Sequence, residues 1–137
     1  MSQMAAAEIV INYIGGELVD AQNGRYLDLY EPASGVIYAQ APNSAVADVE
    51  AAYQAAQSAF TDWSSRSVED RSKVLSRIAD LIEDKLDVLA AAESKDNGKP
   101  VWLAREVDIP RASANFRFFA HAATQFASES HAMPSAI

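Results

Sequence analysis

Residues 36–53, VIYAQAPNSAVADVEAAY, contain the point at which the apolar spacing changes from that of a strand to that of a helix. Up to Pro42, β-branched and aromatic residues favour an extended strand. Beyond it, Ser44 is suited to cap a helix N-terminus, and apolar residues recur at intervals of three or four. They form one stripe along the predicted helix: Val46, Val49, Tyr53, Ala56, Phe60 and Trp63. The sequence therefore predicts an α/β protein in which strands precede this point and helices follow it.

Two further strands are predicted upstream. They cover YIGGELV at 13–19 and RYLDLYEP at 25–32. The Asn23-Gly24 pair predicts a hairpin turn between them, and PASG at 32–35 predicts a second turn before the third strand. We therefore expect a small antiparallel meander over about residues 13–41.

Three more helices are predicted downstream. The first begins at Ser67, which stands in capping-box spacing with Asp70, and continues to about Lys95. Its core face is predicted to hold Leu75, Ile78, Leu81, Ile82, Leu86 and Leu89. A short helix at PVWLARE, residues 100–106, precedes a last helix that starts near Asp108. The apolar stripe of this last helix is Ile109, Ala112, Phe116, Phe119, Ala123 and Phe126.

Length and composition indicate one small soluble domain, because the chain has 137 residues, half of them apolar, and no internal repeat. Its net charge of −8 argues against nucleic acid or an anionic membrane as a partner. The absence of cysteine excludes disulfides and thiol nucleophiles from these residues and agrees with a cytoplasmic location. We expect a loose leader at residues 1–10, and the tail at 128–137 shows no periodicity.

Two residues conflict with local helix rules. Asp96, in KDNGKP at 95–100, puts a negative charge at the negative end of a helix dipole. Arg111, directly after Pro110, puts a positive charge in the predicted first turn of a helix. Both residues could be ordinary surface groups, but a residue that breaks a local rule is a candidate for a functional role.

Three blocks of sequence resemble the N-terminal part of the aldehyde dehydrogenase superfamily. They are YEPASGVIYAQAPNS, then WSSRSVEDRSKVLSRIADLIEDKLDVLAAAESKDNGKP, then REVDIPRASANFRFFA. The wording ESKDNGKP and DIPRASANFRFFA is most similar to the branch of 2-aminomuconic and 2-hydroxymuconic semialdehyde dehydrogenases. The resemblance implies that residues 1–137 are the N-terminal part of an NAD(P)-binding, Rossmann-like domain of a longer enzyme, incomplete here and without the catalytic domain.

The resemblance also implies an activity. In this family a cysteine thiolate attacks an aldehyde, a hydride passes to NAD(P), and a glutamate activates the water that hydrolyses the thioester. This chain has no cysteine, so we assign it no catalytic or cofactor-binding residue and expect it to be inactive alone. The parent enzyme is expected to use NAD, with NADP as the alternative, on a carboxylate-bearing semialdehyde, and to be a homo-oligomer, either a dimer or a tetramer.

Two sites follow from the resemblance. Asp96, with the backbone carbonyls of Leu29 and Tyr30, is expected to contribute to a monovalent cation site for sodium or potassium. Arg111 is expected to bind the carboxylate of the substrate, with Arg105 and Arg117 as the alternatives on neighbouring turns. Two different functions stay open: a stand-alone helical module that binds another protein, and a non-catalytic subunit that assembles with intact enzymes.

Overall fold

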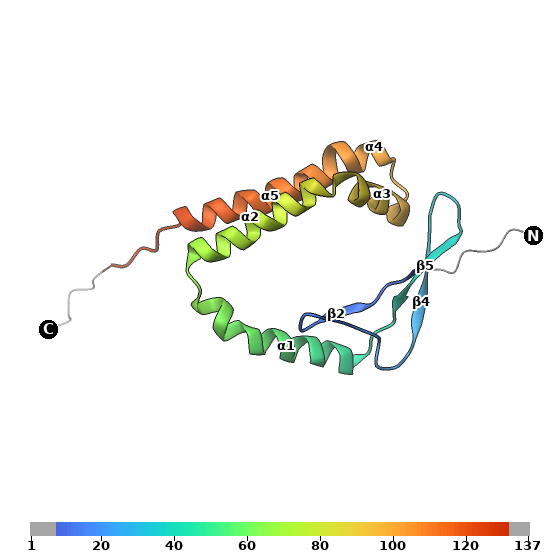
Figure 1. Ribbon diagram of the computed structural model, residues 1–137, viewed down its shortest axis with the longest axis horizontal. Helices are drawn as coiled ribbons and strands as arrows, with labels where there is room; N and C mark the ends of the chain where they lie inside the picture. Colours follow the sequence, from blue (N-terminus) through green and yellow to red (C-terminus); the bar gives the residue numbers. More distant parts are fainter. Residues whose placement is uncertain (1–7, 132–137) are drawn as a thin grey trace, which may run out of the picture.

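The computed structural model describes residues 8–131. Figure 1 shows a small β-region, a long helix below it, and a group of helices above. The elements are β1 (Glu8–Ile9), β2 (Asn12–Ile14), β3 (Glu17–Val19), β4 (Tyr26–Tyr30), β5 (Ile37–Pro42), α1 (Val46–Ser65), α2 (Val68–Asp84), α3 (Leu86–Asn97), α4 (Val101–Leu103), the π-helix η1 (Ala104–Asp108) and α5 (Ile109–Gln125). The predicted α/β class is confirmed.

The strands form a three-stranded sheet in the order β1-β5-β4 and a separate β2–β3 hairpin. The antiparallel pairing of β4 with β5 is confirmed, but the predicted three-stranded meander is wrong. The stretch 13–19 is not one strand. Gly15 and Gly16 both have positive φ, which lets the chain reverse within two residues and pair Ile14 with Glu17.

Asn23-Gly24 does make a turn, but the strands on either side of it do not pair with each other. Instead, the Asn23 side chain donates to the carbonyl of Asn43, which anchors the turn beside the end of β5. The predicted loose leader is also wrong where the structure describes it, because Glu8–Ile9 pairs in parallel with β5. Residues 1–7 and 132–137, which complete the expected leader and tail, lie outside the described residues.

Helix α1 has Ala45 at its N-cap instead of the predicted Ser44. The Ser44 hydroxyl bonds the side chain of Asn12, and Asp48 takes over the cap by accepting from the backbone N–H of Ala45 at 2.7 Å. The predicted apolar stripe of α1 lies on its surface, since Val46 is 86% and Phe60 61% exposed.

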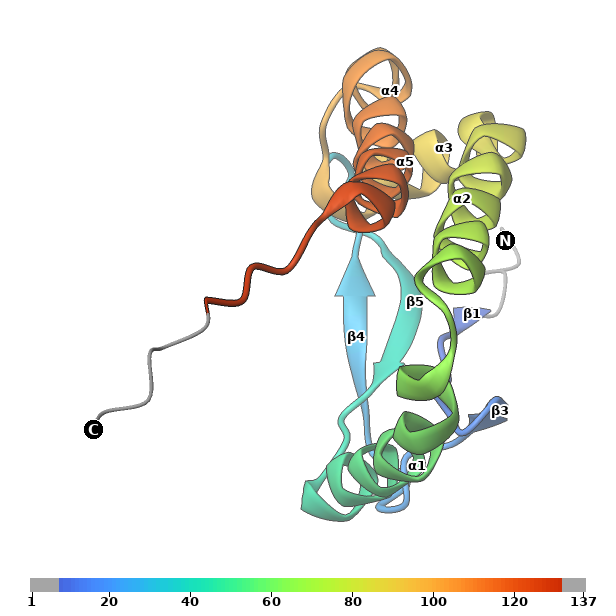
Figure 2. The ribbon, with the colours of Figure 1, turned by 90° about the vertical axis from the view of Figure 1, so that its left-hand side faces the viewer.

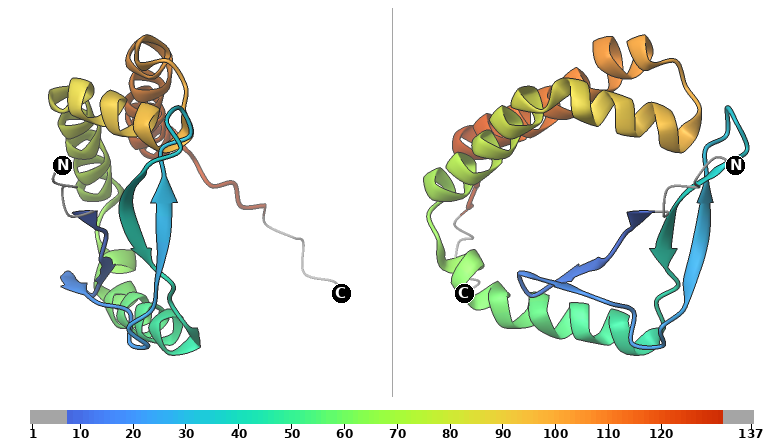
Figure 3. Two further views of the ribbon diagram at one scale, coloured as in Figure 1. Left: turned by 90° about the vertical axis from the view of Figure 1, so that its right-hand side faces the viewer. Right: turned by 45° about the vertical axis from the view of Figure 1, so that its right-hand side comes forward.

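The predicted helix from Ser67 to Lys95 is two helices in the structure. Ser67 is the N-cap as predicted and accepts from the N–H of Asp70 at 3.1 Å. The helix breaks at Lys85, whose φ of −106° and ψ of 17° lie outside the helical region. Neither glycine nor proline stands there. The break turns α3 toward the sheet, as the right-hand panel of Figure 3 shows.

The predicted short helix and last helix form one continuous helical stretch from Val101 to Gln125. In η1 the N–H of Ile109 donates to the carbonyl of Ala104, five residues back. Such a wide turn suits the position before Pro110, which has no N–H and clashes with the carbonyl four residues earlier in a regular helix.

Helices α2 and α5 lie side by side, as Figures 1 and 2 agree. Their contact is made by small side chains: Ala79 on α2 and Ser113 and Ala120 on α5 are at most 1% exposed. The predicted stripe of α5 is therefore not its buried face in this structure, since Phe119 is 62% and Phe126 84% exposed. The predicted residues of α2 are half-buried, apart from Leu81 at 40% exposure.

Ala79→Leu is expected to lower the free energy of unfolding of the chain by about 1–3 kcal/mol, because the close contact of α2 with α5 has no room for a larger side chain. Urea unfolding followed by circular dichroism measures this change. Ala123→Leu is the control, since Ala123 is exposed on α5. An equal loss in both variants would contradict this assignment of the interface.

Candidate functional site

The predicted site residues lie where α3 meets the connection between β4 and β5 and where the α4–α5 stretch begins. Helix α3 ends at Gly98, which has φ of 79° and whose N–H donates to the carbonyl of Ser94. A Cβ at Gly98 would come 3.0 Å from the Cβ of Pro32. Only glycine therefore fits both the backbone angle and the close approach to the β4–β5 connection.

Asp96 is held by the sheet. The Tyr38 hydroxyl on β5 donates to the Asp96 carboxylate at 2.6 Å. The Lys95 ammonium lies 4.8 Å from the centre of the Tyr38 ring. The hydrogen bond to Asp96 raises the pKa of the Tyr38 phenol, with a smaller contribution from burial. The wrong-signed charge at the end of α3 is thus offset by the Tyr38 hydroxyl, and Lys95 lies over the ring of the same tyrosine.

The two backbone residues predicted to join Asp96 lie opposite Tyr38. Leu29 pairs with Ala39 and Tyr30 pairs with Ile37, so Tyr38 is the extra residue of a β-bulge. A bulge interrupts the ladder and leaves backbone groups without their regular strand partners. The bulge therefore places Tyr38, which bonds Asp96, opposite the two residues of β4 whose carbonyls are predicted ligands.

The same residues supply fewer oxygen ligands than a hard cation takes in proteins. Within residues 8–131, no group of three or more His, Cys, Asp or Glu side chains is arranged to hold a metal. The cation site stays a prediction.

Arg111 belongs to a chain of four alternating charges. Its Nη2 lies 3.2 Å from Oδ1 of Asp108, whose Oδ2 lies 2.6 Å from Nζ of Lys99. The same Lys99 ammonium lies 2.9 Å from Glu93 on α3. The chain of charges connects the two predicted sites along the sequence, because Lys99 stands two residues after Asn97, the last residue of α3, and Asp96 precedes Asn97.

The dipole conflict expected at Arg111 does not exist. Arg111 is not in the first turn of a helix, because η1 and α4 continue the helical backbone toward the N-terminus as far as Val101. Arg111 still differs from Arg105 and Arg117, because its side chain is the most exposed of the three. It stands on the side of α5 away from α2, and 69% of its side chain is exposed.

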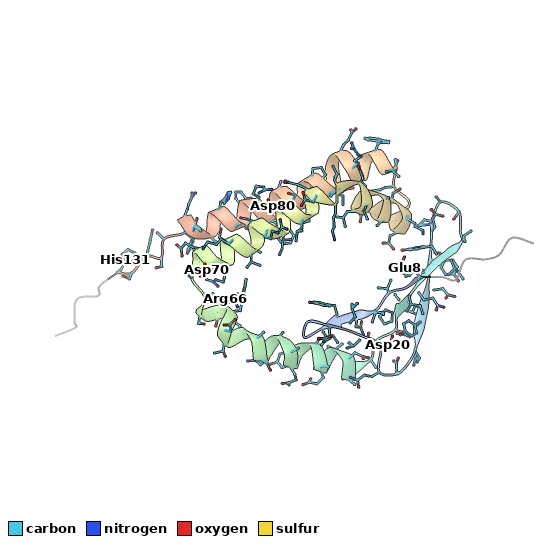
Figure 4. The ribbon with its side chains drawn as sticks, in the orientation of Figure 1. Glu8, Asp20, Arg66, Asp70, Asp80 and His131 are labelled. Carbon is cyan, nitrogen blue, oxygen red and sulfur yellow. The ribbon has the colours of Figure 1, made fainter. Side chains whose placement is uncertain are left out.

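The two alternative arginines are committed to partners within the chain. Arg105 lies 2.6 Å from Asp87, and Arg117 bonds Asp80 at 3.1 Å and Glu83 at 2.8 Å. Asp80 stands on α2 beside α5, where Figure 4 labels it. The side chains of Arg105 and Arg117 are 52% and 37% exposed, less than that of Arg111.

Glu83 is stabilised as an anion in this contact between α2 and α5. Arg117, and then the Ser113 hydroxyl, donate to its carboxylate and lower its pKa. Arg117 therefore joins two helices, whereas Arg111 touches a single carboxylate on its own helix. Of the three arginines, Arg111 is the one best placed to bind a ligand.

Sequence reasoning missed Asp48, which is only 3% exposed. Its carboxylate accepts from the N–H of Gln22 at 2.9 Å and from that of Ala45, and it thereby joins α1 to the turn before β4. The sequence carries no capping-box signal for it, because the actual N-cap is Ala45 and the predicted cap, Ser44, is four residues before Asp48. The roles of Tyr38, Lys99 and Asp108 depend on contacts between separate elements and left no local signal.

The structure also bears on membrane association. Over the range that it describes, none of its helices combines the length and apolar character that a membrane crossing requires.

Comparison with known proteins shows what the chain as a whole resembles. The model of the aldehyde dehydrogenase family matches residues 18–136. The 2-aminomuconic semialdehyde dehydrogenases of Bos taurus and Homo sapiens are 52% and 48% identical over 118 residues, which are 86% of this chain and 24% of each relative. The NAD⁺ complex of an aldehyde dehydrogenase from Bacillus cereus superposes with a TM-score of 0.88 at 32% identity over 93% of this chain and 26% of that one. The chain spans about a quarter of the length of the curated relatives it matches.

Proposed function

Because the chain belongs to the aldehyde dehydrogenase family, we propose that it is the N-terminal part of a longer enzyme that oxidises a carboxylate-bearing semialdehyde with NAD. Residues 1–137 form the front of the NAD(P)-binding domain. The cysteine and glutamate that perform the chemistry belong to parts of the enzyme outside these residues, which contain no cysteine.

Similarity supports the substrate class. About half of the matched residues are identical in relatives named for 2-aminomuconic semialdehyde. A semialdehyde of this kind carries a carboxylate as well as the reacting aldehyde group. The enzyme therefore needs a cation that binds the end of the substrate that does not react.

Arg111 is the single observation that carries the substrate proposal. It is the most exposed of the three candidate arginines, and one hydrogen bond to Asp108 leaves most of its donors available. A guanidinium binds a carboxylate through two parallel hydrogen bonds, so it recognises both charge and orientation. Arg111 is thus proposed to bind the substrate's carboxylate.

The exposed apolar stripes support a longer enzyme. Val46, Val49 and Tyr53 on α1 are 86%, 65% and 58% exposed, and Phe119 on α5 is 62% exposed. Large apolar residues at helical spacing are normally buried. We propose that other parts of the enzyme cover these two stripes.

Cofactor, cation and assembly complete the proposal. NAD is the hydride acceptor, as in the NAD⁺ complex of the Bacillus cereus neighbour, and NADP is the alternative. Asp96 with the carbonyls of Leu29 and Tyr30 contributes to a site for sodium or potassium. The enzyme is a cytoplasmic homo-oligomer, a dimer or a tetramer, with no nucleic acid or membrane partner.

The same stripes also fit a second function, a non-catalytic module that binds another protein. Such a module would need a partner surface that covers α1 and α5. A non-catalytic subunit that assembles with intact enzymes would need one as well. Co-purification of a longer homologous chain would indicate the non-catalytic subunit and not the stand-alone module.

The intact mass of the protein in the cells that make it tests the proposal, measured with an antibody to residues 71–90. We expect a species several times heavier than 14.8 kDa. Once purified, it should reduce NAD when a carboxylate-bearing semialdehyde is added. A species of 14.8 kDa without this activity would contradict the proposal and favour the non-catalytic alternatives.

A further inference from the structure

The four charged side chains Glu93, Lys99, Asp108 and Arg111 form a chain of ion pairs that ends at the exposed Arg111. Side-chain exposure is 25% for Lys99 and 20% for Asp108 but 69% for Arg111. We infer that Asp108 is a positioning residue that aims the Arg111 guanidinium at the substrate's carboxylate, and that Lys99 holds Asp108 in place. This inference rests on the proposed function of Arg111.

Asp108 uses its two oxygens for different purposes. Oδ2 lies 2.6 Å from the Lys99 ammonium, and Oδ1 accepts from Nη2 of Arg111 at 3.2 Å. The shorter and more buried bond fixes the carboxylate. The longer one directs the guanidinium with a single contact and leaves the other N–H groups for a ligand.

Lys99 is itself held firmly. Its backbone N–H donates to Oδ1 of Asn97 at 3.0 Å, and its backbone carbonyl accepts from the Ser94 hydroxyl. The ammonium also bonds Glu93 at 2.9 Å. Because Gly98 packs against Pro32, this position is tied to the β4–β5 connection as well as to α3.

The π-helix places Asp108 and Arg111 on one side of the helical stretch. η1 ends at Asp108, and Pro110 follows directly. Residues three apart in the helix that continues from there are neighbours on its surface, which brings Asp108 under Arg111. The extra backbone width of η1 accommodates Pro110 without breaking the stretch that carries both residues.

The exposed end of this chain of ion pairs is suited to binding an anion. The four side chains carry two negative and two positive charges, and Lys99 is shared between Glu93 and Asp108. Asp108 is therefore only partly balanced by Lys99 and keeps charge with which to hold Arg111. Its single 3.2 Å contact leaves most N–H groups of the exposed guanidinium available, so a substrate carboxylate can pair with an oriented Arg111.

Asp108→Asn in the longer enzyme tests the inference. The substitution keeps the shape of the side chain and removes the charge that directs Arg111. We expect KM for a carboxylate-bearing semialdehyde to rise about three- to tenfold, on the order of one charge-assisted hydrogen bond. KM for a neutral aldehyde of the same length and kcat for both substrates should stay unchanged. Asp108→Glu should restore part of the lost affinity.

Asp80→Asn is the control, because Asp80 on α2 forms its ion pair at 3.1 Å with Arg117 of α5 and not with Arg111. It should leave the preference for a carboxylate unchanged. Equal KM increases for both substrates in Asp108→Asn would mean a general structural loss and would overturn the inference. A lower KM for the semialdehyde would show that Asp108 competes with the substrate, and would overturn it too.

Failure of this inference can be separated from failure of the proposed function. If Arg111→Ala weakens binding of the carboxylate substrate while Asp108→Asn does not, Arg111 binds the substrate without positioning by Asp108. If Arg111→Ala does not discriminate between the two substrates, the proposed role of Arg111 itself is wrong.

Discussion

Arg111→Ala is expected to raise KM for a carboxylate-bearing semialdehyde by about 10- to 100-fold, the range for losing a bidentate charge-assisted contact. KM for a neutral aldehyde of the same length should change little, because that substrate makes no contact with the guanidinium. Steady-state kinetics of the longer enzyme with both substrates measures the difference.

Arg105→Ala is the control for this prediction. Arg105 is also exposed, at 52%, and pairs with Asp87, so its removal costs a comparable surface ion pair on the same helical stretch. Raising the salt concentration should weaken binding of the semialdehyde to the wild type and have less effect on Arg111→Ala. Parallel changes for both substrates in Arg111→Ala would rule out the carboxylate role.

Asp48→Ala is expected to have the largest effect on local stability. It removes the acceptor for the N–H groups of Gln22 and Ala45, at a carboxylate that is 3% exposed. Amide exchange in peptides that cover residues 20–24 and 44–50 should become about 10- to 100-fold faster, because buried donors without an acceptor favour opening. Hydrogen-exchange mass spectrometry measures this change.

Asp62→Ala on the same helix is the control. Asp62 is 73% exposed and, within residues 8–131, forms its ion pair with Arg66 four residues away, near the end of α1 where Figure 4 labels Arg66. Exposed pairs of this kind contribute little. Unchanged exchange in Asp48→Ala would show that Asp48 does not hold the turn to α1.

The effect of Asp48→Ala on stability depends on pH, and the direction of this dependence follows from the contacts of Asp48. The N–H groups of Gln22 and then Ala45 donate to the Asp48 carboxylate and lower its pKa. Its contribution to stability is therefore fully present above the ordinary aspartate pKa of about 3.9 and is lost as the pH falls through the lowered value. The difference in melting temperature between wild type and Asp48→Ala should be constant near neutral pH and should close in acid.

The sequence by itself determined what local rules control. Period-two and period-three-and-a-half spacing located β4, β5 and the helical regions, with α2 and α3 predicted as one helix. The Ser67 cap was found because capping involves residues three apart. The family was identified by three blocks of residues whose order did not depend on the fold. Arg111 and Asp96 were selected in the same way, as residues within short motifs.

Tertiary structure decided what depends on a distant partner. Spacing marks the apolar side of a helix, but which side is buried depends on the surface that meets it, so α2 and α5 meet through Ala79, Ser113 and Ala120 while the aromatic stripe stays exposed. The break at Lys85 has no glycine or proline to announce it.

The contacts of Tyr38 with Asp96 and of Lys99 with Asp108 join residues in different elements. No spacing rule that spans four residues can predict such contacts. The sequence could therefore name Arg111 as a candidate, but only packing of α3 against the β4–β5 connection and of η1 beside Lys99 determined what orients it, because those contacts form only when separate elements meet.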